Sequence, residues 1–197
     1  MAESFLGIKV FLASPSGLED ERKHFREIIW KFNEKVVLKT KFFFIPVMVE
    51  QMTGGDGQAQ GRINKTIDGC DYCITMFWDN LGSPPEADSP EGSESVTDGE
   101  HKKAVKLKAE GELKEAVIFL KKIPPRQLAD KGPALERLLN YVEERKKDSH
   151  LVFFDDAIQF ENQIEQHLLD WLFAFTKGEH KKEPPANVLK YEDPGSD

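Results

Sequence analysis

Apolar runs and helical patterns alternate five times along this chain. Five stretches are almost entirely apolar, with little alternation between apolar and polar positions. We expect these to be strands: Ile8–Ala13, Lys41–Val49, Asp71–Trp78, Glu115–Leu120 and Leu151–Phe154. Near-continuous apolar strands joined by helices are typical of a parallel sheet that is covered on both faces. The pattern therefore predicts an α/β fold.

The segments between these strands carry apolar side chains at helical spacing. The expected faces are Leu18, Phe25, Ile28, Ile29 and Phe32; Ile63 and Ile67 within Gln58–Gly69; Leu135, Leu138, Leu139 and Val142; and Ile164, Leu168, Leu169, Trp171, Leu172 and Phe175. A further helix, polar and rich in Lys, is expected over Thr97–Ala109. Ser16 and Glu19 form a capping box for the first helix. Pro46 indicates an edge position or a bulge for its strand.

Right-handed crossovers restrict such a chain to a doubly wound, flavodoxin-like fold. The simplest arrangement is a five-stranded parallel sheet of order 2-1-3-4-5 with helices on both faces. Ligands bind such sheets beyond the carboxyl ends of the strands, where the winding reverses. Here that point lies between the first and third strands, so the loops Ala13–Gly17 and Trp78–Glu100 are expected to meet there.

One α/β domain is expected over residues 1–178. From Glu179 onward the chain is charged, contains Pro184 and Pro185 and has no apolar periodicity, so residues 179–197 are expected to be a disordered tail or linker. A short α/β domain followed by a linker is often one module of a longer protein, so further domains are expected as partners.

The composition argues against a nucleic-acid-binding protein and against a membrane-spanning one. With 39% apolar and 31% charged residues the chain should be soluble and globular, and a net charge of −8 argues against nucleic-acid binding. No apolar run approaches the roughly 20 residues that span a bilayer, and Met1–Gly7 lacks the regions of a signal peptide. The expected location is cytoplasmic. No metal is expected, because Cys70 and Cys73 lack a second ligand pair.

The first loop, Ser14-Pro15-Ser16-Gly17, opens a helix. Helix N-termini present free N–H groups and a partial positive charge, which suit a phosphate or carboxylate. Ser14 and the loop backbone are therefore candidate ligand contacts. Ser16 is a second candidate, although it could simply cap its own helix.

The third loop begins Trp78-Asp79-Asn80-Leu81-Gly82. The indole of Trp78 could stack on a nicotinamide or purine ring, or it could cover the core. Gly82 permits a turn or a close ligand approach. From Glu86 to Glu100, both included, there are six acidic residues and no Lys or Arg, so the loop should repel phosphates unless it folds aside. Arg62 is the nearest candidate cation.

Glu100 has two interpretations. With Thr97 as N-cap, it occupies the position from which a capping box reaches back, worth about 0.5–2 kcal/mol to the helix. A carboxylate at the start of the helix after the third strand could also serve catalysis. Both roles are compatible, because a capping carboxylate at the edge of the site still faces the ligand.

Three motifs in order carry a resemblance to a known family: IKVFLASPSGLEDER, QGRINKTIDGCDYCITMFWDNLGSPP, and Thr97-Xxx-Xxx-Glu100 with Ala104 four residues on. Over roughly residues 5–176 the chain resembles TIR-like modules long catalogued as a domain of unknown function. These modules are often found at the N-terminus of STAND-type NTPases and other defence proteins. The wider superfamily joins Toll/interleukin-1 receptor domains with nucleoside 2-deoxyribosyltransferases.

The resemblance implies roles for individual residues. In TIR enzymes a Glu at the start of this helix cleaves NAD and follows a Ser by five residues, which Ser95 and Glu100 match. The deoxyribosyltransferases show Asp-Ser-Gly-Thr, two residues, then Glu; here Val96 stands in place of that Gly. Glu100 would be catalytic, and Thr97 would orient it or the ribose. The implied substrate contacts are Ser14, Ser16, Trp78, Asp79, Gly82, Ser95 and Thr97.

The resemblance further implies a TIR-like NAD glycohydrolase with NAD as substrate and no cofactor. It would act in defence or signalling after homotypic self-association. Two alternatives remain open: a nucleosidase or nucleoside deoxyribosyltransferase, which the acidic loop favours because such substrates carry less phosphate, and a non-catalytic interaction adaptor.

Overall fold

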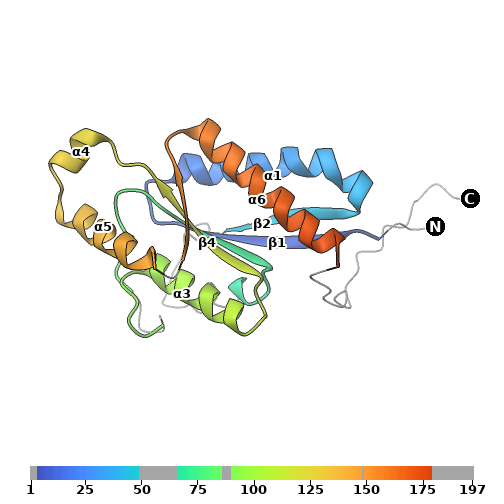
Figure 1. Ribbon diagram of the computed structural model, residues 1–197, viewed down its shortest axis with the longest axis horizontal. Coiled ribbons are helices and arrows are strands. Elements are labelled where there is room, and N and C mark those ends of the chain that lie inside the picture. Colours follow the sequence, from blue (N-terminus) through green and yellow to red (C-terminus); the bar gives the residue numbers. More distant parts are fainter. Residues whose placement is uncertain (1–3, 49–65, 86–89, 148, 179–197) are drawn as a thin grey trace, which may run out of the picture.

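The computed structural model of the chain describes residues 4–48, 66–85, 90–147 and 149–178. At its centre is a parallel five-stranded sheet of order β2-β1-β3-β4-β5 (Figure 1). Its strands are β1 (Leu6–Ala13), β2 (Phe42–Met48), β3 (Tyr72–Phe77), β4 (Glu115–Lys121) and β5 (His150–Phe154). The predicted doubly wound sheet and its strand order are therefore confirmed.

Helices cover both faces of this sheet, as predicted. On one face, α1 (Glu19–Thr40) and α6 (Ala157–Thr176) lie side by side and share one core cluster with the sheet (Figure 1). On the other face, α3 (Val96–Ala109) and α5 (Pro133–Arg145) each contribute to a smaller cluster. A short helix, α4 (Pro125–Ala129), precedes α5. It buries no residue and was not predicted.

All six residues of β3 are buried, because β3 lies in the middle of the sheet with helices above and below it. Its side chains alternate between the two faces. Tyr72, Ile74 and Met76 belong to the cluster under α1 and α6, while Cys73 faces α3 and Phe77 faces α5. Thr75 lies on the same side as Cys73 and is the polar exception in this strand.

The two edges of the sheet differ. β2 forms one edge and pairs with β1, with Val10 opposite Pro46. Pro46 thus lies in an edge strand, as predicted, where a residue without an N–H donor is tolerated. β5 forms the other edge and pairs with β4, and its Phe153 side chain is 50% exposed.

The predicted capping role of Ser16 is wrong. Helix α1 begins at Glu19 with Leu18 as N-cap and no side-chain cap. Gly17 has a φ of 90°, and this left-handed residue separates the exposed Ser16 from the helix start. The Glu19 carboxylate instead accepts a hydrogen bond from the Gly17 N–H at 3.1 Å.

Some predictions fall outside the described residues. These are Arg62, the tail over 179–197 and most of the helix expected over Gln58–Gly69, of which Thr66 and Ile67 are helical. Among the described residues, no helix has the length and apolar character needed to cross a membrane.

Candidate functional site

Three segments meet at the carboxyl edge of the sheet where the winding reverses. The meeting point is Gly82, which has a φ of 97°. A Cβ atom added there would lie 3.1 Å from Pro15 Cβ and 3.2 Å from Thr97 Oγ1. The β1–α1 loop, the loop after β3 and the start of α3 are therefore in close contact. Gly82 is required here by both its backbone conformation and the lack of space.

The N-cap of α3 is Ser95, and the prediction that Thr97 caps this helix is wrong. Ser95 Oγ accepts a hydrogen bond from the Asp98 N–H at 3.0 Å. In return, Asp98 Oδ2 accepts one from the Glu94 N–H at 2.8 Å. Ser95 caps the helix, and Asp98 reaches back to the residue before the cap, so the arrangement is close to a capping box.

Glu100 is therefore not a capping residue, and it lies in the second turn of α3. It is 6% exposed, and burial raises the pKa of its carboxyl to about 8. No hydrogen bond from another described side chain offsets that burial. One turn later, Ala104 packs in the cluster that contains Cys73. Burial raises the pKa of the Cys73 thiol, and the nearby charge of Glu100 adds to this effect.

A buried hydrogen bond fixes the same turn of α3 to the sheet. Thr75 Oγ1 and His101 Nδ1 lie 3.1 Å apart, and both residues are almost fully buried. Neither was predicted, because they are 26 residues apart and belong to different elements. This bond anchors the backbone that carries Glu100.

Val96 needs no special backbone conformation. It is the first residue of α3, and its N–H donates to the Ser83 carbonyl at 3.0 Å. Lys41 is the single described non-glycine residue with positive φ. Val96 is therefore compatible with the local geometry.

Arg22 supplies a cation that the sequence reasoning missed. Its Nη1 donates to Ser14 Oγ at 2.8 Å and to the Pro15 carbonyl at 3.0 Å, and its Nη2 donates to Glu19 Oε1 at 2.8 Å. The guanidinium thus shapes the first loop from within α1. Hydrogen bonds from the Glu19 and Gly17 backbone, together with Arg22, lower the pKa of Glu19.

Trp78 is half-buried and packs against the core clusters on both sides of the sheet. Lys121 Nζ lies 4.6 Å from the centroid of its ring and pairs with Glu21 Oε1 at 2.5 Å. Trp78 Nε1 is buried and makes no hydrogen bond within the described residues. Trp78 covers the core in this structure, and stacking on a base would require Lys121 to move.

Asp79 lies within a hydrogen-bonded turn. Its Oδ1 accepts from Asn80 Nδ2 at 2.8 Å, and Asn80 Oδ1 accepts from the Gly82 N–H at 2.8 Å. Gln127 Nε2, from α4, lies 3.4 Å from Asp79 Oδ2. Asp79 therefore shapes the turn that presents Gly82.

The structure groups the predicted site residues unevenly. Ser14 flanks the meeting point through its neighbour Pro15, and Gly82 and Thr97 form it. Ser95 is the N-cap of the same helix, and Glu100 lies three residues beyond Thr97 along it. Ser16 is exposed and Trp78 packs on the core instead. Within the described ranges, no group of three or more His, Cys, Asp or Glu side chains could hold a metal ion.

Comparisons with known proteins give a family and weak structural likenesses. A family model described as "Domain of unknown function (DUF4062)" matches residues 9–169. No curated protein matches the chain. Translation elongation factor SelB from Methanococcus maripaludis, with the GTP analogue GppNHp, is 9% identical with a TM-score of 0.43. That match covers 91% of this chain and 36% of the other. RosB with a bound flavin intermediate is 11% identical with a TM-score of 0.32, covering 95% and 93%. Neither likeness bears on function.

Proposed function

The chain belongs to the DUF4062 family, a domain of unknown function, and we propose that it is a TIR-like NAD glycohydrolase with Glu100 as its catalytic residue. The supporting observation is the state of Glu100: a buried carboxyl, not used as a cap, in the helix whose first turn contacts the reversal point of the sheet through Thr97. Burial of a carboxyl costs stability, and carboxyls with raised pKa values are concentrated at functional sites.

The chemistry suits a carboxylate close to the sugar. When the nicotinamide–ribose bond breaks, its electron pair leaves with the nicotinamide, and the ribose becomes an oxocarbenium-like cation. A carboxylate stabilises that cation or traps it covalently, as in glycosidases. Water then adds to C1′, giving ADP-ribose and a proton.

The raised pKa of Glu100 fits a cationic substrate. At neutral pH the buried carboxyl is mostly protonated, because its pKa is about 8. The nicotinamide ring of NAD carries a positive charge, and an opposite charge nearby favours the ionised carboxylate. Substrate binding would therefore generate the catalytic form of Glu100.

The remaining residues would hold the substrate. Ser14 and the N-terminus of α1, with Arg22 behind them, would bind a phosphate. Gly82 would allow close approach of the ligand, and Thr97, in contact distance of that glycine, would orient the ribose or Glu100. As the resemblance implies, self-association would complete the active site of a defence or signalling effector.

A nucleosidase or deoxyribosyltransferase is the second candidate, and the pKa of Glu100 favours it. The base of a nucleoside is neutral and leaves more readily when it is protonated. A carboxyl with a pKa of about 8 is protonated at neutral pH and can donate that proton.

The test measures nicotinamide release from NAD at high protein concentration and on a multimerising scaffold. Wild type is compared with Glu100→Gln and with Glu110→Gln, a matched change at an exposed position that ends the same helix. Release that is lost in the first variant and kept in the second supports the proposal. No release from any assembled form would refute the proposal and favour the adaptor. Equal release from both variants would refute the catalytic role of Glu100. Cleavage of nucleosides but not NAD would favour the second candidate.

A further inference from the structure

The outer edge of β5 lacks the features that usually protect an edge strand. Natural proteins protect such edges with Lys, Pro, bulges or a covering element, because free N–H and C=O groups invite another strand. β5 reads His-Leu-Val-Phe-Phe and contains no Lys, no Pro and no carboxylate. Phe153 exposes half of its side chain. The opposite edge, β2, carries Pro46.

The backbone of β5 shows which groups face outward. The Phe154 carbonyl accepts a hydrogen bond from the Lys122 N–H at 2.8 Å, so the Phe154 carbonyl faces β4. Because alternate residues of a strand face alternate sides, Leu151 and Phe153 turn their backbone groups to the outer edge. Gln163 agrees with this direction, since its Nε2 donates to the Phe153 carbonyl at 2.8 Å. A strand that pairs here must share this carbonyl with Gln163 or displace that side chain.

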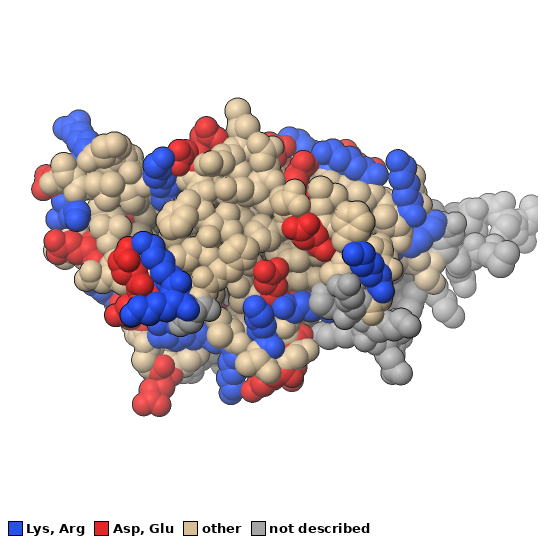
Figure 2. All heavy atoms as spheres, viewed as in Figure 1, with Lys and Arg blue, Asp and Glu red and all other residues tan. Residues whose placement is uncertain are grey.

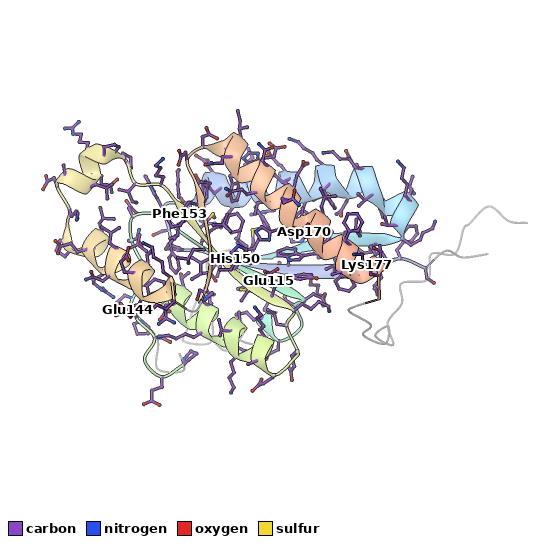
Figure 3. The ribbon with its side chains drawn as sticks, in the orientation of Figure 1. Glu115, Glu144, His150, Phe153, Asp170 and Lys177 are labelled. Carbon is purple, nitrogen blue, oxygen red and sulfur yellow. The ribbon has the colours of Figure 1, made fainter. Side chains whose placement is uncertain are left out.

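The surface around this edge is uncharged along the strand and charged at its ends. Figure 2 shows a broad area without Lys, Arg, Asp or Glu across the middle of this face, where Figure 3 labels His150 and Phe153. Exposed Lys146 and Lys147 precede the strand, and exposed Asp155 and Asp156 follow it. Lys146 pairs with Glu143, and Asp155 pairs with Lys122 at 2.9 Å. Lys147 therefore makes the basic end of the edge and Asp156 the acidic end, neither of them with a described ion pair.

We propose that β5 pairs antiparallel with β5 of a second copy of this chain, about a twofold axis at Val152. In that register Leu151 of one copy faces Phe153 of the other, and both residues present outward backbone groups, so they exchange N–H···O bonds. The basic end of each strand then lies against the acidic end of the other. A parallel arrangement would bring like charges together. The interface is isologous, as in most dimers.

This dimer does not depend on the chemistry proposed for Glu100. Its test is the oligomeric state of the full chain, measured by sedimentation equilibrium from micromolar concentrations to about 1 mM. Phe153→Lys places a charge on the edge of each copy and should weaken dimerisation at least about tenfold. Phe173→Lys is the matched control, because Phe173 is 60% exposed on α6.

A wild-type dimer that is weakened by Phe153→Lys and unchanged by Phe173→Lys supports the proposal. A monomer at every concentration, or equal weakening by both variants, overturns it. Thermal unfolding of each variant shows that the fold is retained.

A cross-link tests the register. In the proposed pairing the two Val152 residues form a non-hydrogen-bonded pair with Cα atoms about 4.5 Å apart, within reach of a disulfide. Val152→Cys should therefore form a covalent dimer under mild oxidation, whereas Phe173→Cys should not. Cys70 and Cys73 are buried and do not interfere. Failure of the Val152→Cys protein to cross-link, or equal cross-linking of both variants, overturns the register.

Discussion

Ser95 Oγ accepts a hydrogen bond from the backbone N–H of Asp98 at 3.0 Å. Because of this bond, Ser95 is the N-cap of α3. Glu100 therefore takes no part in capping the helix. A carboxylate that reached back to the helix start would be explained by that task alone. Glu100 instead lies buried one turn further along, with its pKa raised to about 8 by that burial.

Ser95→Ala should lower the free energy of unfolding by about 1–2 kcal/mol, because it removes the acceptor of a buried cap. Thr97→Val removes a hydroxyl at nearly constant shape and should cost less. Urea unfolding of both variants, read by circular dichroism, gives the comparison. The reverse ranking would assign the cap to Thr97.

Because of the raised pKa of Glu100, the free energy of unfolding should fall as the pH rises from about 4.5 to 8. The folded pKa is about 8 and the ordinary value is 4.5, so in this range the unfolded chain has lost a proton that the folded chain retains. Fewer protons in the unfolded state mean that stability decreases with pH. The full effect is on the order of 5 kcal/mol, since each unit of pKa corresponds to about 1.4 kcal/mol.

Glu100→Gln cannot ionise and should lack this slope. Its stability relative to wild type should therefore rise between pH 4.5 and 8, and denaturant unfolding at several pH values measures the difference. The exposed Glu110→Gln variant should follow wild type throughout. Identical slopes for wild type and Glu100→Gln would show that this carboxyl is not buried in its protonated form.

The fold was predictable because its signal is repeated along the chain. Strands such as Tyr72–Phe77 are apolar throughout, and only the middle of a parallel sheet explains such a run. Helix starts were less predictable, since Ser95 and Thr97 are both good N-caps within two residues of each other. Helix α4 was missed because it is five residues long and buries none of them, so it has no apolar periodicity.

The candidate site was predictable as a region but not in its contacts. Strand order alone selected the loops after β1 and β3. The catalytic role of Glu100 was predicted from the family resemblance and stays a prediction. The Arg22–Ser14 and Thr75–His101 pairs join different elements, so no local pattern reveals them. Trp78 was equally suited to stacking and to core packing, and the position of Lys121 over its ring became visible only in three dimensions.

The pH dependence of NAD cleavage should reveal which form of Glu100 acts. If the carboxylate stabilises the ribosyl cation, kcat/KM should rise with pH and level off above about 8, where the free enzyme is ionised. With a nucleoside as substrate, a carboxyl that donates a proton to the leaving base would give the opposite profile, with activity declining above about 8. Steady-state rates of nicotinamide release from NAD and of base release from a nucleoside, from pH 5.5 to 9.5, distinguish the two, and flat profiles for both substrates would contradict both.

Arg22→Gln should raise KM for NAD about tenfold, because Arg22 holds Ser14 and the Pro15 carbonyl in the loop proposed to bind a phosphate. Nicotinamide riboside has the same scissile bond and no phosphate, so its KM should change little. Lys23→Gln removes the same charge from an exposed neighbour and serves as the control. Equal increases for both substrates would indicate a general distortion of the site. Equal effects of the two variants would indicate long-range attraction, leaving Arg22 without a specific role in phosphate binding.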